Sequence, residues 1–121
     1  MSNYTTKTLI NALNQGTVDF NSTIQLIDSE YSFTPSRFIN GSQINEPNTN
    51  NGSCKIFGFA QLNGLSEQAV LNAFGDYYTV DVLQNPKGND HQNIRNFMVT
   101  GWPGVKFETL PLKKIDHKLD L

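Results

Sequence analysis

Apolar residues recur at the spacing of an amphipathic helix in two segments that precede Pro35. The first segment, residues 5–14, is followed by Gly16, and glycine is common immediately after a helix. The second begins at Asp19 or Asn21, either of which is a favourable N-cap. The apolar stripes are Leu9, Ile10 and Leu13 in the first segment, and Phe20, Ile24, Ile27 and Tyr31 in the second. The pattern predicts two helices, the second of which ends before Pro35.

Residues 32–44 alternate only loosely between apolar and polar side chains. Asn40-Gly41 lies inside this segment, and Asn-Gly between apolar residues is a strong hairpin signal. We expect a short β pair here, or an extended loop. Residues 45–53, with the sequence NEPNTNNGS, are predicted to form a turn-rich polar loop.

Three further helices are predicted in the second half of the chain, with Ser53, Ser66 and Asp90 as their N-caps. The first is apolar on more than one face, which is typical of a central core helix. The second is interrupted at Gly75, and the third ends at Gly101. The side chains expected in the core are Ile56, Phe57, Phe59, Ala60 and Leu62, then Val70, Leu71, Phe74 and Tyr78, and finally Ile94, Phe97 and Met98.

The end of the chain returns to the core through a Trp-Pro-Gly turn at residues 102–104, and residues 109–121 are predicted to be a flexible tail. A chain of 121 residues that is 37% hydrophobic can bury one core without disulfides or metals. We therefore predict a compact single domain over residues 1–121. Its fold class is mainly α, or α+β with little β, with four or five helices and a short β pair near residues 32–44.

Composition excludes several classes of protein. Only 17% of the residues are charged and 11% are aromatic, which argues against global disorder. The net charge of -2 excludes a nucleic-acid-binding protein that relies on bulk positive charge. No apolar run approaches the roughly 20 residues that span a bilayer, so no membrane association is expected. In place of charges the chain carries 15 asparagines and 7 glutamines, many of them at predicted caps and turns.

No metal or cofactor is expected. His91 and His117 are isolated from each other, no Cys/His spacing suits zinc, and no acidic loop suits calcium. Neither a GxGxxG nor a Walker A pattern for binding nucleotide phosphates occurs.

Cys54 is the one cysteine, so no intramolecular disulfide can form. It opens a predicted helix, and helix N-termini favour the thiolate by lowering a thiol's pKa. His91 and Asn93 would complete a Cys-His-Asn arrangement for nucleophilic catalysis. The alternative is a small buried cysteine that packs like an apolar residue.

Two segments contain candidate ligand-binding residues. His91 and Arg95 are four residues apart on one helix face, and with the helix N-terminus they could hold a phosphate or carboxylate. Arg37 could pair with Asp76 or Glu46 as a structural contact, or could line a polar pocket together with Arg95. The alternatives are a solvated helix face around His91 and buried rings after Gly75. The candidates are Arg37, Asn40, Asp76, Tyr78, His91 and Arg95.

Several runs of the chain resemble the HopJ type III effector family. They are YSFTP at 31–35, FING at 38–41, NGSCKIF at 51–57, FAQL at 59–62, FGDYY at 74–78, DVL at 81–83 and DHQNIRNF at 90–97. The resemblance covers roughly residues 18–107. It implies a small bacterial protein without an established enzymatic activity, so no catalytic residue is transferred. The residues that match the family's motifs are Asn40, Gly41, Gly52, Cys54, Gly75, Asp76, Tyr78, His91, Asn93, Arg95 and Trp102.

The resemblance and the residues leave three functions open. The first is a non-catalytic binding or effector-type protein with a polar pocket, whose partner is a host or bacterial protein or a small anionic ligand. The second is a thiol-dependent hydrolase or transferase that uses Cys54 and His91. The third is a cytoplasmic, unsecreted protein that binds a small anion. A monomer is expected.

The N-terminus is compatible with two destinations. It lacks the basic and apolar regions of a Sec signal peptide, so the bacterial cytoplasm is expected. Its first 25 residues are rich in Ser, Thr, Asn and Gln, which is also typical of leaders exported by type III secretion.

Overall fold

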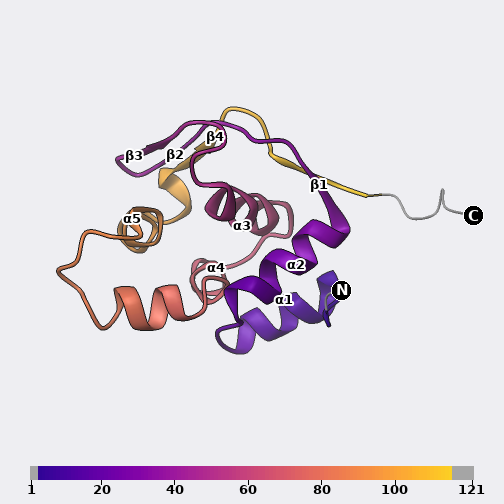
Figure 1. Ribbon diagram of the computed structural model, residues 1–121, viewed down its shortest axis with the longest axis horizontal. Helices are drawn as coiled ribbons and strands as arrows, with labels where there is room; N and C mark the ends of the chain where they lie inside the picture. The colour runs from indigo at the N-terminus through magenta and orange to yellow at the C-terminus, as the bar shows by residue number, and fades with distance from the viewer. Residues whose placement is uncertain (1–2, 116–121) are drawn as a thin grey trace, which may run out of the picture.

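The structure of the protein is a computed structural model that describes residues 3–115 (Figure 1). The helical elements are α1 (Thr6–Gln15), α2 (Phe20–Glu30), α3 (Asn51–Leu62), α4 (Glu67–Asn72), the π-helix η1 (Tyr77–Val82), α5 (Gln92–Thr100) and the 3-10 turn η2 (Trp102–Gly104). The strands are β1 (Tyr31–Phe33), β2 (Phe38–Asn40), β3 (Gln43–Asn45), β4 (Val105–Phe107) and β5 (Leu112–Lys114). The predicted mainly helical α+β fold with little β is confirmed. None of the helices within residues 3–115 has the length and apolar character needed to cross a membrane.

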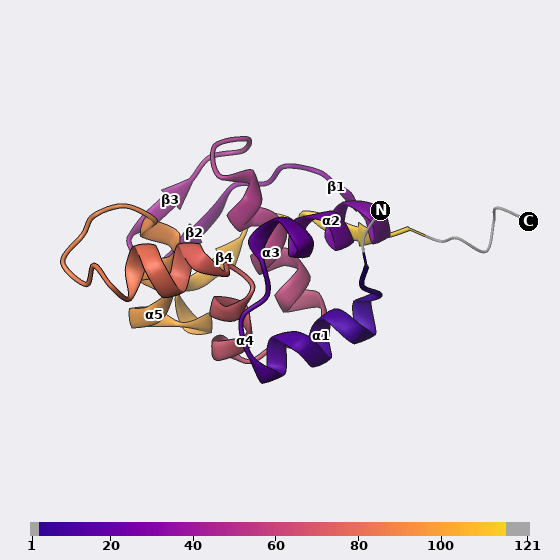
Figure 2. The same cartoon turned by 60° about the horizontal axis from the view of Figure 1, so that its bottom comes forward.

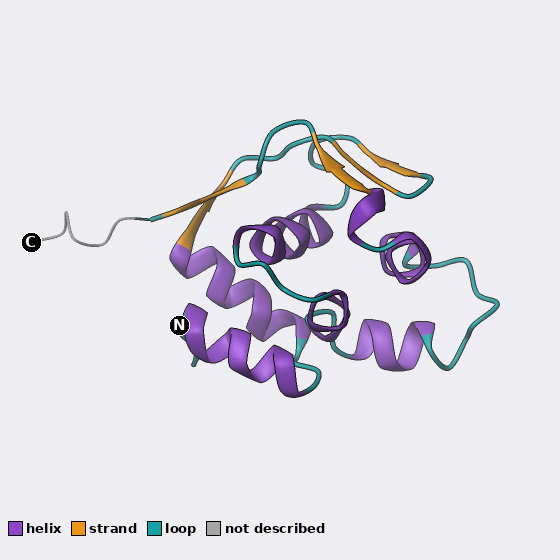
Figure 3. Ribbon diagram, turned by 180° about the vertical axis from the view of Figure 1, so that it is seen from behind, coloured by secondary structure: helices purple, strands orange, loops and turns teal. Residues whose placement is uncertain are grey.

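The helix α3 lies in the middle of the fold, as its apolar residues on several faces predict. The strands cover one side of it, α1, α2 and α4 lie on the other, and α5 flanks it (Figures 1 and 3). Phe57 of α3 is fully buried, and its ring centroid lies 5.1 Å from that of Phe97 and 5.8 Å from that of Phe74. These rings join α3 to α5 and to the turn after α4, and so fix the elements that surround the site.

The predicted hairpin is present and carries a third strand. β2 pairs antiparallel with β3 on one side and with β4 on the other. Asn40 is the last paired residue, opposite Gln43, so the turn consists of Gly41 and Ser42. Gly41 has a φ of +60°, a conformation that glycine adopts without steric cost. The Asn-Gly signal therefore located the hairpin, but Asn40 belongs to the strand.

The prediction of a flexible tail from residue 109 is wrong for its first part. β5 pairs antiparallel with β1, with Tyr31 opposite Lys114 and Phe33 opposite Leu112. The Leu112 side chain is buried, which holds this strand against the core. Tyr31, predicted as the last residue of a helical stripe, is the first residue of β1 and is likewise buried. Residues 116–121 of the predicted tail lie outside the described residues.

Most of the predicted helix boundaries agree with the structure. Asp19 accepts a hydrogen bond from the Ser22 N–H and caps α2, and Ser66 accepts one from the Ala69 N–H and caps α4. Gly75 follows the end of α4 and has a φ of +57°, so the helix does not continue through it. A Cβ at this position would lie 2.8 Å from the Val18 carbonyl oxygen, so a larger residue does not fit.

Four predictions for α3 and α5 are wrong. The N-cap of α3 is Asn50 instead of Ser53, and the N-cap of α5 is His91 instead of Asp90, whose carboxyl is bound by Arg95. Leu62, the last residue of α3, was predicted to face the core but is 43% exposed. Met98 was also predicted to face the core but is 44% exposed. It lies on the outer face of α5, beside the exposed Val99.

Candidate functional site

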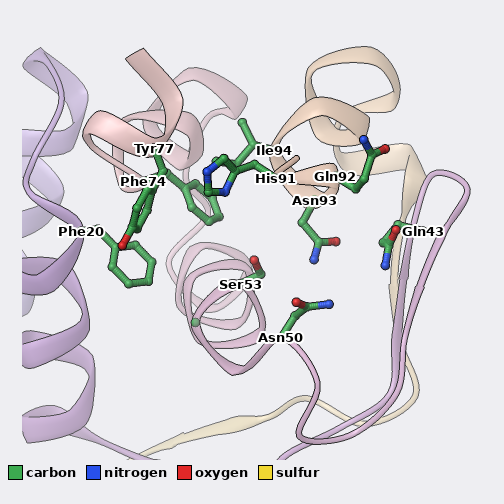
Figure 4. A pocket seen from close by; sticks show the side chains of 11 residues that line it. Phe20, Gln43, Asn50, Ser53, Phe74, Tyr77, His91, Gln92, Asn93 and Ile94 are labelled. Carbon is green, nitrogen blue, oxygen red and sulfur yellow. The ribbon is translucent and has the colours of Figure 1, made fainter. Parts of the chain in front are cut away.

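A cavity of about 370 Å³ lies between the starts of α3 and α5 (Figure 4). Its lining comprises Phe20 of α2; Gln43 of β3; Asn50, Gly52 and Ser53 at the start of α3; Phe74 and Tyr77 after α4; and His91, Gln92, Asn93 and Ile94 at the start of α5. No aspartate or glutamate belongs to this lining. The volume falls within the range of about 300–1,000 Å³ that is usual for small-ligand sites.

The start of α3 carries no side-chain cap. Asn50 occupies the N-cap position, but its amide donates a 2.6 Å hydrogen bond to the Asn45 Oδ1 instead of accepting one from its own helix. The first intrahelical bond runs from the Cys54 N–H to the Asn50 carbonyl. The N–H groups of Gly52 and Ser53 precede it, so they have no carbonyl partner within the helix. They bring the positive end of the α3 dipole to the cavity.

The start of α5 has the same property for a different reason. His91, the N-cap residue, is in the left-handed conformation with φ 49° and ψ 50°, which is uncommon for a residue other than glycine. Its Nε2 lies 2.9 Å from the Asp81 Oδ2, so the imidazole is directed to η1 and does not cap α5. Gln92 and Asn93 precede the first intrahelical hydrogen bonds, which the Ile94 and Arg95 N–H groups donate to the His91 carbonyl.

A cluster of four asparagines holds the two helix starts together. The Asn45 Oδ1 accepts hydrogen bonds from Asn50 at 2.6 Å and from Asn93 at 2.9 Å, and the Asn45 Nδ2 donates to the Asn93 Oδ1 at 3.0 Å. The Asn40 Nδ2 donates to the Asn93 backbone carbonyl at 2.7 Å. Asn40, Asn45 and Asn93 are all buried. The β2–β3 hairpin therefore fixes both helix starts through side-chain amides.

Arg95 does not line the cavity. Its guanidinium donates to the Asn85 carbonyl at 2.9 Å and to the Asp90 Oδ1 at 2.6 Å, and so fastens the 85–90 loop to α5. The hydrogen bond from Arg95 lowers the pKa of the exposed Asp90 carboxyl. Gly88 lies under this contact, since a Cβ there would be 2.7 Å from the Arg95 Nη2.

Three more of the predicted ligand-binding residues, Arg37, Asp76 and Tyr78, also lie outside the cavity lining. Arg37 pairs with Glu46 at 3.4 Å, one of the two structural contacts predicted for it. Asp76 and Asp19 line a separate hollow, which shares Tyr77 with the cavity. Tyr78 is buried in the core, and its neighbour Tyr77 is the tyrosine that faces the cavity.

Cys54 is buried and lies behind the cavity wall. Its side chain is 3% exposed, and its Sγ lies 3.8 Å from the Ser36 carbonyl oxygen. Burial raises the pKa of the Cys54 thiol, which opposes thiolate formation. Because α3 begins at Asn51, Cys54 is the fourth helical residue, and Ser53 is the residue that reaches the cavity.

The described residues, 3–115, include no group of three or more His, Cys, Asp and Glu side chains arranged to hold a metal ion. Of the residues predicted from sequence, the structure brings His91 and Asn93 to one cavity and places Asn40 behind Asn93.

Comparison with known proteins identifies the family. The sequence profile described as "HopJ type III effector protein" matches residues 6–112. The chain belongs to the HopJ family. The match extends beyond the resembling residues 18–107 to include α1 and the first residue of β5.

A solved structure similar to this HopJ protein is titled "Crystal structure of unknown function protein VPA0580". The two chains are 49% identical with a TM-score of 0.87, and the alignment covers 90% of this chain and 92% of the other. The comparison with curated proteins found no match. These comparisons therefore establish the family and the fold but assign no activity.

Several residues around the candidate site were not among the predicted candidates. Asn45 and Asn50 lie in the predicted polar loop, and Phe20 lies in a predicted helix stripe. Tyr77 belongs to the run after Gly75 whose hydroxyls were expected to face a ligand, but its neighbour Tyr78 was the candidate. The high asparagine content is the sequence feature that could have indicated the asparagine cluster, because an asparagine side chain can donate and accept hydrogen bonds at once.

Proposed function

We propose that this HopJ-family protein is a non-catalytic binding protein that holds a small ligand with an anionic group, such as a phosphate or a carboxylate. One observation carries the proposal: the first residues of α3 and of α5 line the same cavity, and neither helix start has a side-chain cap. N–H groups at helix N-termini bind anions because they combine donors with the positive end of the helix dipole.

The side chains of the cavity support this chemistry. The Ser53 hydroxyl and the His91 imidazole supply further polar contacts beside the helix N–H groups. The lining contains no carboxylate that would repel an anion. Asp81 contacts His91 from η1 and orients the imidazole without itself lining the cavity.

A thiol-dependent hydrolase or transferase is less well supported. Such an enzyme would need the Cys54 thiolate beside His91 in the cavity. The thiol is instead buried with a raised pKa, and its polar contact is with the Ser36 carbonyl.

The family description supports the further proposal that the protein is exported through a type III system, with binding taking place in the recipient cell. The same cavity would serve a cytoplasmic protein that is not secreted. Fusing residues 1–25 to a reporter, in strains with and without the secretion apparatus, distinguishes the two: apparatus-dependent export is expected of an effector, and retention in both strains would contradict it.

The binding proposal is tested by titrating ¹⁵N-labelled protein with inorganic phosphate and following the backbone amide resonances. Saturable shifts are expected at Gly52, Ser53, Gln92 and Asn93, since their N–H groups would contact the anion. Sodium chloride at equal ionic strength is the control. Shifts confined to surface lysines, or equal effects of chloride, would contradict the proposal.

A further inference from the structure

One side of the cavity is built from aromatic rings. Tyr77 lies between two of them, with its ring centroid 5.1 Å from that of Phe20 and 5.1 Å from that of His91. Phe20 in turn stacks on the buried Phe74, with centroids 6.3 Å apart. Tyr77 is nevertheless 42% exposed, so part of its surface is available to a ligand. We call Phe20, Phe74, Tyr77 and His91 the aromatic wall.

The opposite side of the cavity is polar. In Figure 4, Asn50, Asn93, Gln43 and Gln92 lie on the opposite side of the cavity from Phe20, Phe74 and Tyr77, with Ser53 between the two sides. The helix N–H groups proposed to bind the anion belong to Gly52 and Ser53 and to residues 92–93. A ligand that occupied the whole cavity would therefore contact both the helix N–H donors and the aromatic surface.

The aromatic wall depends on a glycine at the start of α3. A Cβ at Gly52 would lie 2.7 Å from the Cζ of Phe20, so a larger residue would displace this ring. Gly52 therefore lets the Phe20 ring approach the helix start closely, which brings the rings next to the N–H groups.

Carboxylates are unevenly distributed around Tyr77. The cavity has no carboxylate in its lining, although Asp81 and Asp90 contact the His91 Nε2 at 2.9 and 3.9 Å. Asp19 and Asp76 line a separate hollow that shares Phe20, Phe74 and Tyr77 with the cavity. An anionic group is disfavoured in that hollow, so the cavity is the more favourable place for it.

We infer that the ligand combines a planar ring with its anionic group: it is an aromatic phosphate or carboxylate whose ring packs on the aromatic wall. This inference rests on the proposed function and adds the ring, which the helix N–H groups do not require. Ring contacts of this kind strengthen binding in addition to the area they bury.

The test compares phenyl phosphate, methyl phosphate, inorganic phosphate, benzoate and acetate as probes of the full-length protein, by calorimetric or NMR titration. Phenyl phosphate is expected to bind about tenfold more tightly than methyl phosphate or inorganic phosphate, the gain typical of one stacked ring. A corresponding gain of benzoate over acetate would identify a carboxylate as an equally suitable anionic group, and its absence would restrict the ligand to aromatic phosphates.

Variants at Tyr77 assign the gain to the aromatic wall. Tyr77→Leu should abolish the preference for phenyl phosphate over inorganic phosphate, measured as the ratio of the two affinities in the same variant, and Tyr77→Phe should keep that preference. Circular dichroism checks that each variant is folded. Phenyl phosphate that binds no more tightly than inorganic phosphate, or a preference that survives Tyr77→Leu, would overturn the inference and leave the proposed function standing. If none of the anions binds, both fall.

Discussion

At the scale of single residues, asparagine both donates and accepts hydrogen bonds without carrying a charge, which neither a carboxylate nor a cationic side chain can do. Asn45 accepts hydrogen bonds from Asn50 and Asn93 through one atom and donates to Asn93 through the other. A charged side chain in this buried position would need a partner of opposite charge, and an aspartate could not donate. The neutral cluster therefore organises the helix starts without neutralising their positive ends.

Cys54 gives a prediction at the same scale. Because burial raises the pKa of its thiol, the native protein should react with iodoacetamide at pH 8 at least about tenfold more slowly than the protein unfolded in urea. The folded protein keeps the Cys54 thiol proton to a higher pH than the unfolded protein does. The free energy of unfolding should therefore fall as the pH rises above about 8.5, the ordinary pKa of a cysteine thiol. Mass spectrometry measures the alkylated fraction. Equal alkylation rates for native and unfolded protein would contradict this prediction and would favour the thiol-dependent enzyme.

At the scale of elements, the helices were predictable and most strands were not. The periodicity of apolar residues identified α1 and α2, and local capping signals identified Asp19 and Ser66. The three-residue strands β1 and β5 carry too little pattern to be recognised, and their pairing joins Tyr31 to Lys114 at the far end of the chain.

The helix starts at the site were mispredicted for a physical reason. The side chains at these starts are engaged elsewhere: Asn50 binds Asn45 of β3, Asp90 binds Arg95 within α5, and His91 binds Asp81 of η1. Helix-capping preferences do not indicate these contacts. His91 and Asn93 were predicted as site residues and Asn45 was not, and after Gly75 the candidate was Tyr78, whereas Tyr77 lines the cavity.

The link between elements gives the next prediction. Asn45→Ala removes the side chain that joins the β2–β3 hairpin to both helix starts. The buried Asn93 Nδ2 then loses its acceptor, and the exposed Asn50 amide loses its bond to the hairpin. The substitution should lower the free energy of unfolding by about 1–3 kcal/mol, measured by urea denaturation. It should also weaken phosphate binding by the folded protein, because the helix starts lose their common support.

Two controls interpret this variant. Asn14→Ala replaces an exposed asparagine in α1 and should change stability by less than about 0.5 kcal/mol. Asn72→Ala removes a buried amide that donates to the Leu13 carbonyl and is not part of the cavity lining, so it should cost stability without changing phosphate affinity. A loss of affinity in Asn72→Ala equal to that in Asn45→Ala would show that general destabilisation, and not the asparagine cluster, affects the site.

At the scale of the whole molecule, the fold brings together segments that are distant in the sequence. The core around α3 supports the hairpin on one side and α5 on the other, and the cavity opens between them (Figures 2 and 4). The binding surface thus consists of the ends of elements held by a common core. Such an arrangement suits selective binding, because its donors are positioned before a ligand arrives.

The crystal structure of the protein grown with phenyl phosphate tests this account most directly. The account predicts a phosphate group within hydrogen-bond distance of the N–H groups at the start of α3 and at the start of α5, with the phenyl ring against Tyr77. A phosphate bound elsewhere, or a cavity that holds no ligand at saturating concentrations in solution and in the crystal, would contradict it.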